Sequence, residues 1–433
     1  MENLLAASER AGRRVFFWIN PIAWFREKNL SRGYWTFFAA AFFYDAGFAV
    51  YFFIFNLYLM DLGFSDRAIG LIGGSFTFGS LVGTLPAGAL ARRIGLRSLV
   101  VALFITAPLL NVFRALWVWE PGQIALAFMA GVVMSAWGVC FLPAIARLTV
   151  EEDRPAAFSF IFSTSVGTSI LGGVVCGYLR RWLEMAGFSI SAARVKEWIL
   201  LTACTIVPIG LLAVWRLRFP SETQGEIRVE SSWLHGWCLS PFLRRFLPVM
   251  ALWCAVLAAF TPFANIYLSR NLHLPMEQVG LAFSLAQAIQ LCMGLLVPLV
   301  SRMLGLVKGI AAMQAAAAVV LGCMAQVTSP QLAVALYLIF SAAQWMSTPA
   351  LFNFLMNKTP DVERSTAAAM TLFSNSLAGS AATAGAGILF TRFGYPPVLI
   401  WIALIALAIA LLFLFLMGPI SRGPIGAESI RKS

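Results

Sequence analysis

Long apolar runs, each ended by charged or turn-forming residues, follow one another along most of the chain. A helix needs about 20 mostly apolar residues to cross a hydrocarbon core of ~30 Å, and these runs reach that length. A membrane β-barrel would instead need short segments of alternating polarity. We therefore predict an all-α membrane protein with twelve transmembrane helices, at about 34–60, 68–90, 98–118, 122–146, 156–178, 198–218, 246–268, 277–300, 305–326, 331–356, 366–390 and 395–418.

One long polar gap divides these runs into two sets of six. The predicted organisation is a cytoplasmic basic and aromatic N-terminal segment (1–33), a first six-helix bundle (34–218), a cytoplasmic central loop (219–245), a second six-helix bundle (246–418) and a cytoplasmic tail (419–433). The mixture of arginines with tryptophan and phenylalanine in the N-terminal segment favours a position along the inner membrane interface.

Composition agrees with a membrane protein and argues against an enzyme. Apolar residues make up 60% of the chain and charged residues 12%, whereas a soluble domain has about 45–50% and 25%. The sequence has only two histidines, no Walker-type glycine loop and no cluster of metal ligands, so we expect neither a cofactor nor ATP-driven pumping. Seven cysteines without a CxxC pair imply no disulfide framework.

The positive charges indicate how the chain is oriented. With both termini in the cytoplasm, 23 of the 31 lysines and arginines fall in cytoplasmic segments. The net charge of +12 is then explained by basic loops that contact anionic lipid headgroups, and nucleic acid is not an expected partner. We predict a multi-pass protein of the plasma (inner) membrane with cytoplasmic termini.

The two halves show a weak internal repeat at a shift of about 210 residues. The sequence Asn56-Leu57-Tyr58-Leu59 aligns with Asn265-Ile266-Tyr267-Leu268, and Gly95-Leu96 aligns with Gly305-Leu306. Arg154 aligns with Arg364 in two acidic loops, and Trp137 aligns with Trp345 at a slightly shorter shift. Matches in the same order along both halves predict two pseudo-symmetric bundles.

Four segments make the chain resemble the major facilitator superfamily over about residues 33–418. They are NLYLMDLGFSDRAIGL, PAGALARRIGLR, VEEDRPAAFSF and FTRFGYPPVLI. The resemblance implies a secondary transporter that works by alternating access, with a substrate site near the membrane midplane between the bundles. We expect a monomer whose partners are a small-molecule substrate, protons and membrane lipids.

The predicted inner-gate loop between the second and third helices departs from the family pattern. The matching residues are Gly88, Arg93, Gly95 and Arg97. Arg92 stands where the family has an aspartate that helps to hold the inner gate shut. Two interpretations remain open. The arginines of this loop either reach the acids of the next cytoplasmic loop, Glu151, Glu152 and Asp153, or only set the topology.

Asp45 is an acid in the middle of an apolar run, FFYDAGFAVYFF. It lies about 16 Å along the first predicted helix, near the midplane, where an ionised group costs about 2.5–3.5 kcal/mol. The carboxyl group can therefore couple transport to protons, bind a cationic group of the substrate, or accept hydrogen bonds from tyrosine or serine hydroxyls. Cys254 occupies the equivalent position in the second half, so this chemistry is not duplicated.

Further candidate residues come from the helices that line the pathway in this superfamily. Helical spacing places Asp45, Ala49, Phe52 and Asn56 on one face. The facing candidates are Trp137, Ser165, Gln287, Gln290, Gln344, Trp345 and Asn375. Amides among aromatic side chains favour an uncharged or amphipathic organic solute, although single amides also serve in helix packing. Asn56 and Asn265 either close an outer gate or cap their helices.

The sequence thus predicts a secondary active transporter of a small neutral or amphipathic organic solute, coupled to protons through Asp45. The alternative is a protein on the same fold that does not carry out coupled transport, either a sensor or a lipid scramblase. Gradient-driven flux separates these possibilities.

Overall fold

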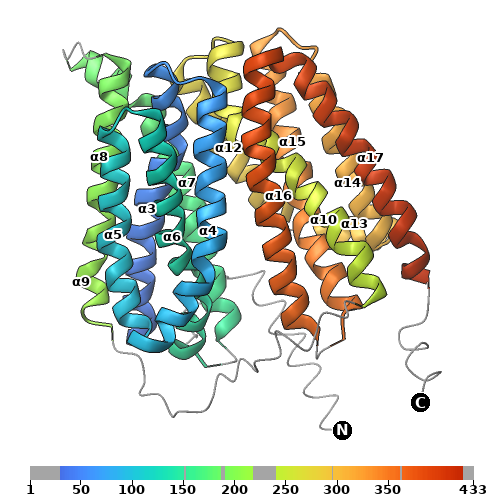
Figure 1. The fold of residues 1–433 in the computed structure, drawn as a ribbon, viewed down its shortest axis with the longest axis horizontal. Helices are drawn as coiled ribbons and strands as arrows, with labels where there is room; N and C mark the ends of the chain where they lie inside the picture. Colours follow the sequence, from blue (N-terminus) through green and yellow to red (C-terminus); the bar gives the residue numbers. More distant parts are fainter. Residues whose placement is uncertain are drawn as a thin grey trace, which may run out of the picture.

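The computed structural model describes residues 30–150, 153–186, 191–217, 240–294, 296–360 and 363–422. The predicted N-terminal segment and central loop, and the end of the tail, lie mostly outside these residues. Within them the chain forms helices that cross the molecule twelve times, in two bundles that stand side by side (Figure 1). The predicted fold class is therefore confirmed.

The first bundle contains six crossings. Ser31 and Ser65 cap the first two by accepting a hydrogen bond from a backbone N–H in the first turn, and the last crossing is interrupted near Pro208. The helices are α3 (Arg32–Asp61), α4 (Asp66–Ile94), α5 (Leu96–Leu116), α6 (Glu120–Leu148), α7 (Arg154–Met185), α8 (Ala192–Ile209) and α9 (Leu211–Val214).

The second bundle also contains six crossings, the first two of which are broken. Pro262 lies where the first crossing changes from α-helix to a 3₁₀ turn. The elements are α10 (Pro241–Phe260), η2 (Thr261–Phe263), α11 (Ala264–Ile266), η3 (Tyr267–Asn271), α12 (Met276–Gly294), α13 (Val297–Leu304), α14 (Leu306–Met324), α15 (Pro330–Lys358), α16 (Arg364–Phe393) and α17 (Tyr395–Arg422).

The internal repeat recurs in the geometry. Gly95 and Gly305 both precede a helix and have φ angles of 82° and 79°, a left-handed conformation that favours glycine. The hydroxyl of Tyr58 donates to the carbonyl of Ala115 at 2.7 Å, and that of Tyr267 donates to Met324 at 2.9 Å. Each bond joins the first crossing of a bundle to its third.

Among the described residues, ten crossings are long and apolar enough to span a membrane by length and composition, and α12 and α16 fall outside that group. Both of these helices pack against the opposite bundle, α12 on α7 and α16 on α4. Small and polar side chains are common where membrane helices pack against each other, whereas surfaces that face lipid are more apolar. Their lower hydropathy therefore reflects their position between the bundles.

The sixth crossing begins earlier than the sequence indicates. α8 starts at Ala192, six residues before the predicted boundary, and so includes Lys196 and Glu197. The Lys196 ammonium group lies 2.7 Å from the Asp61 carboxylate, and Lys196 is buried. An unpaired lysine is costly inside a membrane helix. The pairing with Asp61 compensates the charge of Lys196, so the helix can include it.

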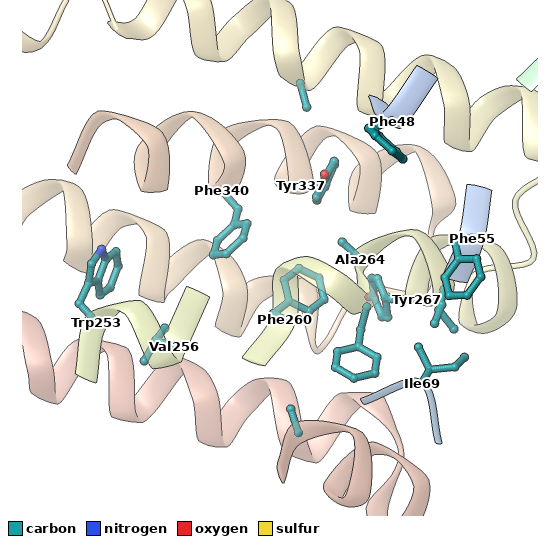
Figure 2. Packing of buried hydrophobic residues seen from close by; sticks show 14 of the residues in the cluster. Phe48, Phe55, Ile69, Trp253, Val256, Phe260, Ala264, Tyr267, Tyr337 and Phe340 are labelled. Atoms are coloured by element: carbon teal, nitrogen blue, oxygen red, sulfur yellow. The ribbon is translucent and has the colours of Figure 1, made fainter. Parts of the chain in front are cut away.

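The two bundles meet at one end and diverge at the other (Figure 1). We name the end with the α3–α4 link (62–65) the joined end, and the end with Gly95 the open end. In Figure 2, Phe55 and Ile69 of the first bundle lie beside Tyr267 of the second. All three are buried, so the apolar core is continuous across the bundles near the joined end.

Candidate substrate and proton site

Two asparagines join the bundles reciprocally. The Asn56 side chain donates a hydrogen bond to the carbonyl of Pro262 at 2.8 Å. The Asn265 side chain donates to the carbonyl of Phe53 at 3.1 Å, so each asparagine reaches the opposite bundle. Both bonds cross between the bundles, and the Asn265 Oδ1 atom also accepts a hydrogen bond from the backbone N–H of Ile266 at 2.9 Å. We call this pair of bonds the asparagine clasp.

Further polar contacts reinforce the joined end. The Arg270 guanidinium lies 3.1 Å from the Asp66 carboxylate, which is buried. The hydroxyl of Ser380 donates to the carbonyl of Gly74 at 2.7 Å, and that of Ser284 donates to Ile170 at 2.7 Å. These contacts connect α4 with η3 and α16, and α7 with α12.

Glycines allow the helices to approach closely there. A Cβ atom on Gly70 would lie 2.8 Å from the Thr383 carbonyl oxygen and 2.9 Å from the Gly387 Cα. Gly173 and Gly280 make a similar contact between α7 and α12. Because no side chain separates these backbones, the bundles touch directly at the joined end.

Asp45 lies on the face of α3 that is directed at the second bundle. Because Asn56 binds Pro262 across the interface, its helix face is fixed, and Ala49 and Asp45 follow at helical spacing. Asp45 is half-buried, near the middle of α3. On the same face, Phe42 and Phe52 are 40% and 38% exposed, so the second bundle does not cover this stretch.

Ser165 and an aromatic stack surround Asp45. The side chain of Ser165, on α7, lies near the Asp45 carboxyl group, so the structure brings these two candidates together. The ring of the preceding Tyr44 stacks on Trp137 at 4.3 Å, and Phe37 stacks on the same indole at 5.8 Å. Since Tyr44 and Phe37 are seven residues and ~10 Å apart on α3, they take opposite faces of Trp137. Trp137 thus positions the helix segment that carries Asp45.

Two candidates of the second bundle form hydrogen bonds with other polar side chains of that bundle. Gln290 donates to Ser341, and Thr261 donates to Gln344 at 3.5 Å. Asn375 is half-buried, and its Oδ1 atom is buried without a hydrogen-bond partner. Of the two remaining candidates, Gln287 is half-buried and Trp345 is exposed beside Gly294.

Arg114, a buried cation of the first bundle, is separate from Asp45. Arg114 is 2% exposed, and its guanidinium carbon lies 4.3 Å from the centre of the Phe55 ring. It donates to the Asn111 side chain at 3.0 Å. Phe55 lies near the joined end, about 15 Å along α3 from Asp45, so Arg114 stabilises that end by cation–π contact.

The predicted inner-gate residues lie at the open end. Gly88 is half-buried within α4, and Arg92 and Arg93 are exposed in its last turn. Arg97 donates to the carbonyl of Trp215 at 2.7 Å and so anchors α5 to the end of the sixth crossing. The proposed partners Glu151 and Glu152 lie outside the described residues.

The sequence did not predict two ion pairs that the structure contains, Asp66–Arg270 and Asp61–Lys196. All four residues lie near predicted helix ends, where charges are ordinarily solvated. The spacing within each pair is more than one hundred residues, so local sequence patterns carry no sign of the pairing.

The fold and this site define a multi-pass membrane protein of two pseudo-symmetric bundles, with a polar midplane face between them. The family model of the Major Facilitator Superfamily matches residues 37–383. The chain belongs to this superfamily. No curated protein matches the sequence.

Solved transporter structures share the fold at low sequence identity. The nucleoside transporter NupG matches with 15% identity and a TM-score of 0.73, covering 89% of this chain and 99% of that chain. A bacterial homologue of the human lysosomal transporter Spinster, inward-facing and unoccupied, matches with 13% identity, a TM-score of 0.73 and coverages of 89% and 97%. The inward-open xylose transporter XylE from E. coli matches with 14% identity, a TM-score of 0.67 and coverages of 87% and 94%.

Proposed function

We propose that this chain is a secondary active transporter that moves a small neutral or amphipathic organic solute by alternating access, coupled to protons through Asp45. The observation that carries the proposal is the position of Asp45. Its half-buried carboxyl group lies mid-helix on the face of α3 that is directed at the other bundle. An acid at this depth is costly unless it has a function there.

The contacts at the joined end fit a gate that opens and closes. The hydrogen bonds of the asparagine clasp each contribute roughly 0.5–1.5 kcal/mol, so they can be exchanged for contacts at the opposite end. The inward-facing state of the Spinster homologue and of XylE supports the assignment of the open end to the cytoplasm. The prevalence of lysine and arginine in the corresponding loops supports the same orientation.

The proposal includes the remaining organisation expected from the sequence. The chain functions as a monomer in the plasma (inner) membrane with cytoplasmic termini and lipid contacts. Its two working units are the bundles at 34–218 and 246–418. They are linked by the central loop at 219–245.

The protonation of Asp45 would control the rearrangement. A protonated Asp45 is neutral and can be enclosed when the bundles rock, whereas an ionised carboxylate opposes enclosure in a medium of low polarity. The face around it presents Phe42, Ala49 and Phe52, which suits the apolar part of a solute. Amides of the second bundle would supply hydrogen bonds without fixed charge.

The experiment is solute flux in proteoliposomes, with and without a pH gradient, for wild type, Asp45→Asn and Glu120→Gln. Uridine and D-xylose are suitable first solutes, because structurally similar transporters carry nucleosides and xylose. Asparagine retains the hydrogen-bond acceptor for Ser165 but cannot carry the proton. Glu120 is an exposed acid at the start of α6 and serves as the matched control.

We expect Asp45→Asn to exchange solute across the membrane but not to concentrate it, while Glu120→Gln behaves as wild type. Unchanged gradient-driven uptake in Asp45→Asn would show that the carboxyl group is a packing element. Binding of a solute by wild type without any flux would favour a sensor.

A further inference from the structure

Helices α4 and α16 run in opposite directions and keep a constant register where they touch. A Cβ atom on Gly70 would lie 2.9 Å from the Gly387 Cα, and one on Gly74 would lie 3.1 Å from the Ala384 Cβ. Moving toward the open end, residue numbers therefore rise along α4 and fall along α16 by nearly equal amounts. The contact ends as the bundles diverge (Figure 1).

The same register can be continued to the open end of both helices. Gly88 then lies opposite Ala369, and Arg92 lies opposite residues 365–366, within one turn of Glu363. Gly88 shares the contact face of α4 with Gly70 and Gly74 by helical spacing. A Cβ atom on Gly88 would have no neighbour within 4 Å, so this small residue has open space beside it in the present state.

Apolar side chains near Gly88 are exposed on both helices. Leu85 of α4 is 65% exposed, and Phe373 of α16 is 57% exposed. The continued register sets them opposite each other, on the faces that touch at the joined end. Closing the open end along this register would bury both side chains against each other, which the hydrophobic effect favours.

The charges at the two helix ends are complementary. Glu363 is the residue before α16, and its Oε2 atom is buried without a hydrogen-bond partner. Arg92 is exposed and falls on the contact face, whereas Arg93 is rotated by about 100° away from it. The neighbouring Arg364 donates to the carbonyls of Met356 and Thr359 and is thereby already engaged.

We propose that the open end closes by packing α4 against α16 in this register, with an ion pair between Arg92 and Glu363. The family pattern has an aspartate at the position of Arg92. In this chain the acid of the gate would instead be Glu363 of the second bundle, and Arg92 would be its basic partner. This inference rests on the proposed alternating access, and it names the contact that the second state makes.

Cross-linking tests the closure without depending on flux. Gly88→Cys and Ala369→Cys are introduced together into a variant without the natural cysteines, and disulfide formation is followed under oxidising conditions. In the same background, Arg92→Glu is compared with Arg93→Glu as the matched control. The exchanged variant Arg92→Glu/Glu363→Arg tests whether the two side chains act as a pair.

We expect the double-cysteine protein to cross-link, and Arg92→Glu to slow the reaction by about fivefold, as for a partly exposed ion pair. The exchanged variant should recover the original rate, and Arg93→Glu should leave it unchanged. Absence of cross-linking in a folded protein that transports solute would overturn the proposed contact. An equal effect of Arg92→Glu and Arg93→Glu, or no recovery on exchange, would overturn the pair. Cross-linking without any flux would instead refute the transport function while leaving the closure intact.

Discussion

Removal of the asparagine clasp should shift the protein toward the state in which the joined end is open. The perturbation is Asn56→Ala combined with Asn265→Ala. Each variant deletes one bond between the bundles, of 2.8 and 3.1 Å. A side-chain hydrogen bond contributes roughly 1 kcal/mol, so the double variant loses about 2 kcal/mol, which corresponds to about a 30-fold change in the equilibrium.

The reporter for this shift is a cysteine at position 69, in a protein without its natural cysteines. Ile69 is 1% exposed and lies beside Tyr267 at the contact between the bundles (Figure 2). A membrane-impermeant maleimide added on the side of the joined end can react only when that end opens. The labelling rate therefore follows the population of the open state.

The reciprocal geometry makes the prediction specific. Each single variant should raise the labelling rate by about fivefold, and the two effects should be similar, because both bonds cross the same interface. Asn353→Ala is the control, since Asn353 is exposed and binds Asn357 within its own helix. Labelling of the double variant at the wild-type rate would refute the view that the clasp holds the joined end.

Three further predictions address the remaining contacts. Arg270→Gln should raise the same labelling rate by no more than about fivefold, because Arg270 is partly exposed and its pair with Asp66 is weakened by solvent; an effect larger than that of the clasp would contradict this ranking. Lys196→Met should lower the thermal midpoint in detergent, since it leaves the Asp61 carboxylate without its partner, and Asp61→Asn in the same protein should restore much of the loss. Gly70→Leu should hold the joined end open by steric conflict with α16, which would appear as fast labelling that the clasp variants no longer increase.

The sequence was most informative where a pattern occurs twice. The repeated asparagine and tyrosine positions predicted two pseudo-symmetric bundles, and the tyrosine bonds to the third crossing of each bundle confirm this. From the repeat alone, the asparagines could either close a gate or cap their helices. The bond that joins Asn56 to the second bundle depends on the carbonyl of Pro262, which lies at a helix break that the spacing of apolar residues does not reveal.

Other features were hidden because they depend on distant partners. Trp137 was predicted to face the pathway, and the stacking of Tyr44 and Phe37 on the two faces of its ring could not be predicted from the sequence. Lys196 was expected outside the membrane helices, because an isolated charge normally marks a helix end. Its partner Asp61 is on another helix, and the compensation appears only when both are placed in space.

The face of α3 could be predicted from spacing alone, but its direction could not. Asp45, Ala49, Phe52 and Asn56 share one side of any α-helix. Only the bond from Asn56 to the second bundle shows that this side is directed at the interface and not at lipid.

The measurement that tests the central claim most directly is solute-driven proton movement in proteoliposomes that enclose a pH-sensitive dye. Addition of a transported solute to one side, without an imposed pH gradient, should change the internal pH with wild type and with Glu120→Gln. It should leave the internal pH unchanged with Asp45→Asn, although that variant still exchanges solute. Equal proton movement in wild type and Asp45→Asn would contradict the assignment of Asp45 as the coupling group.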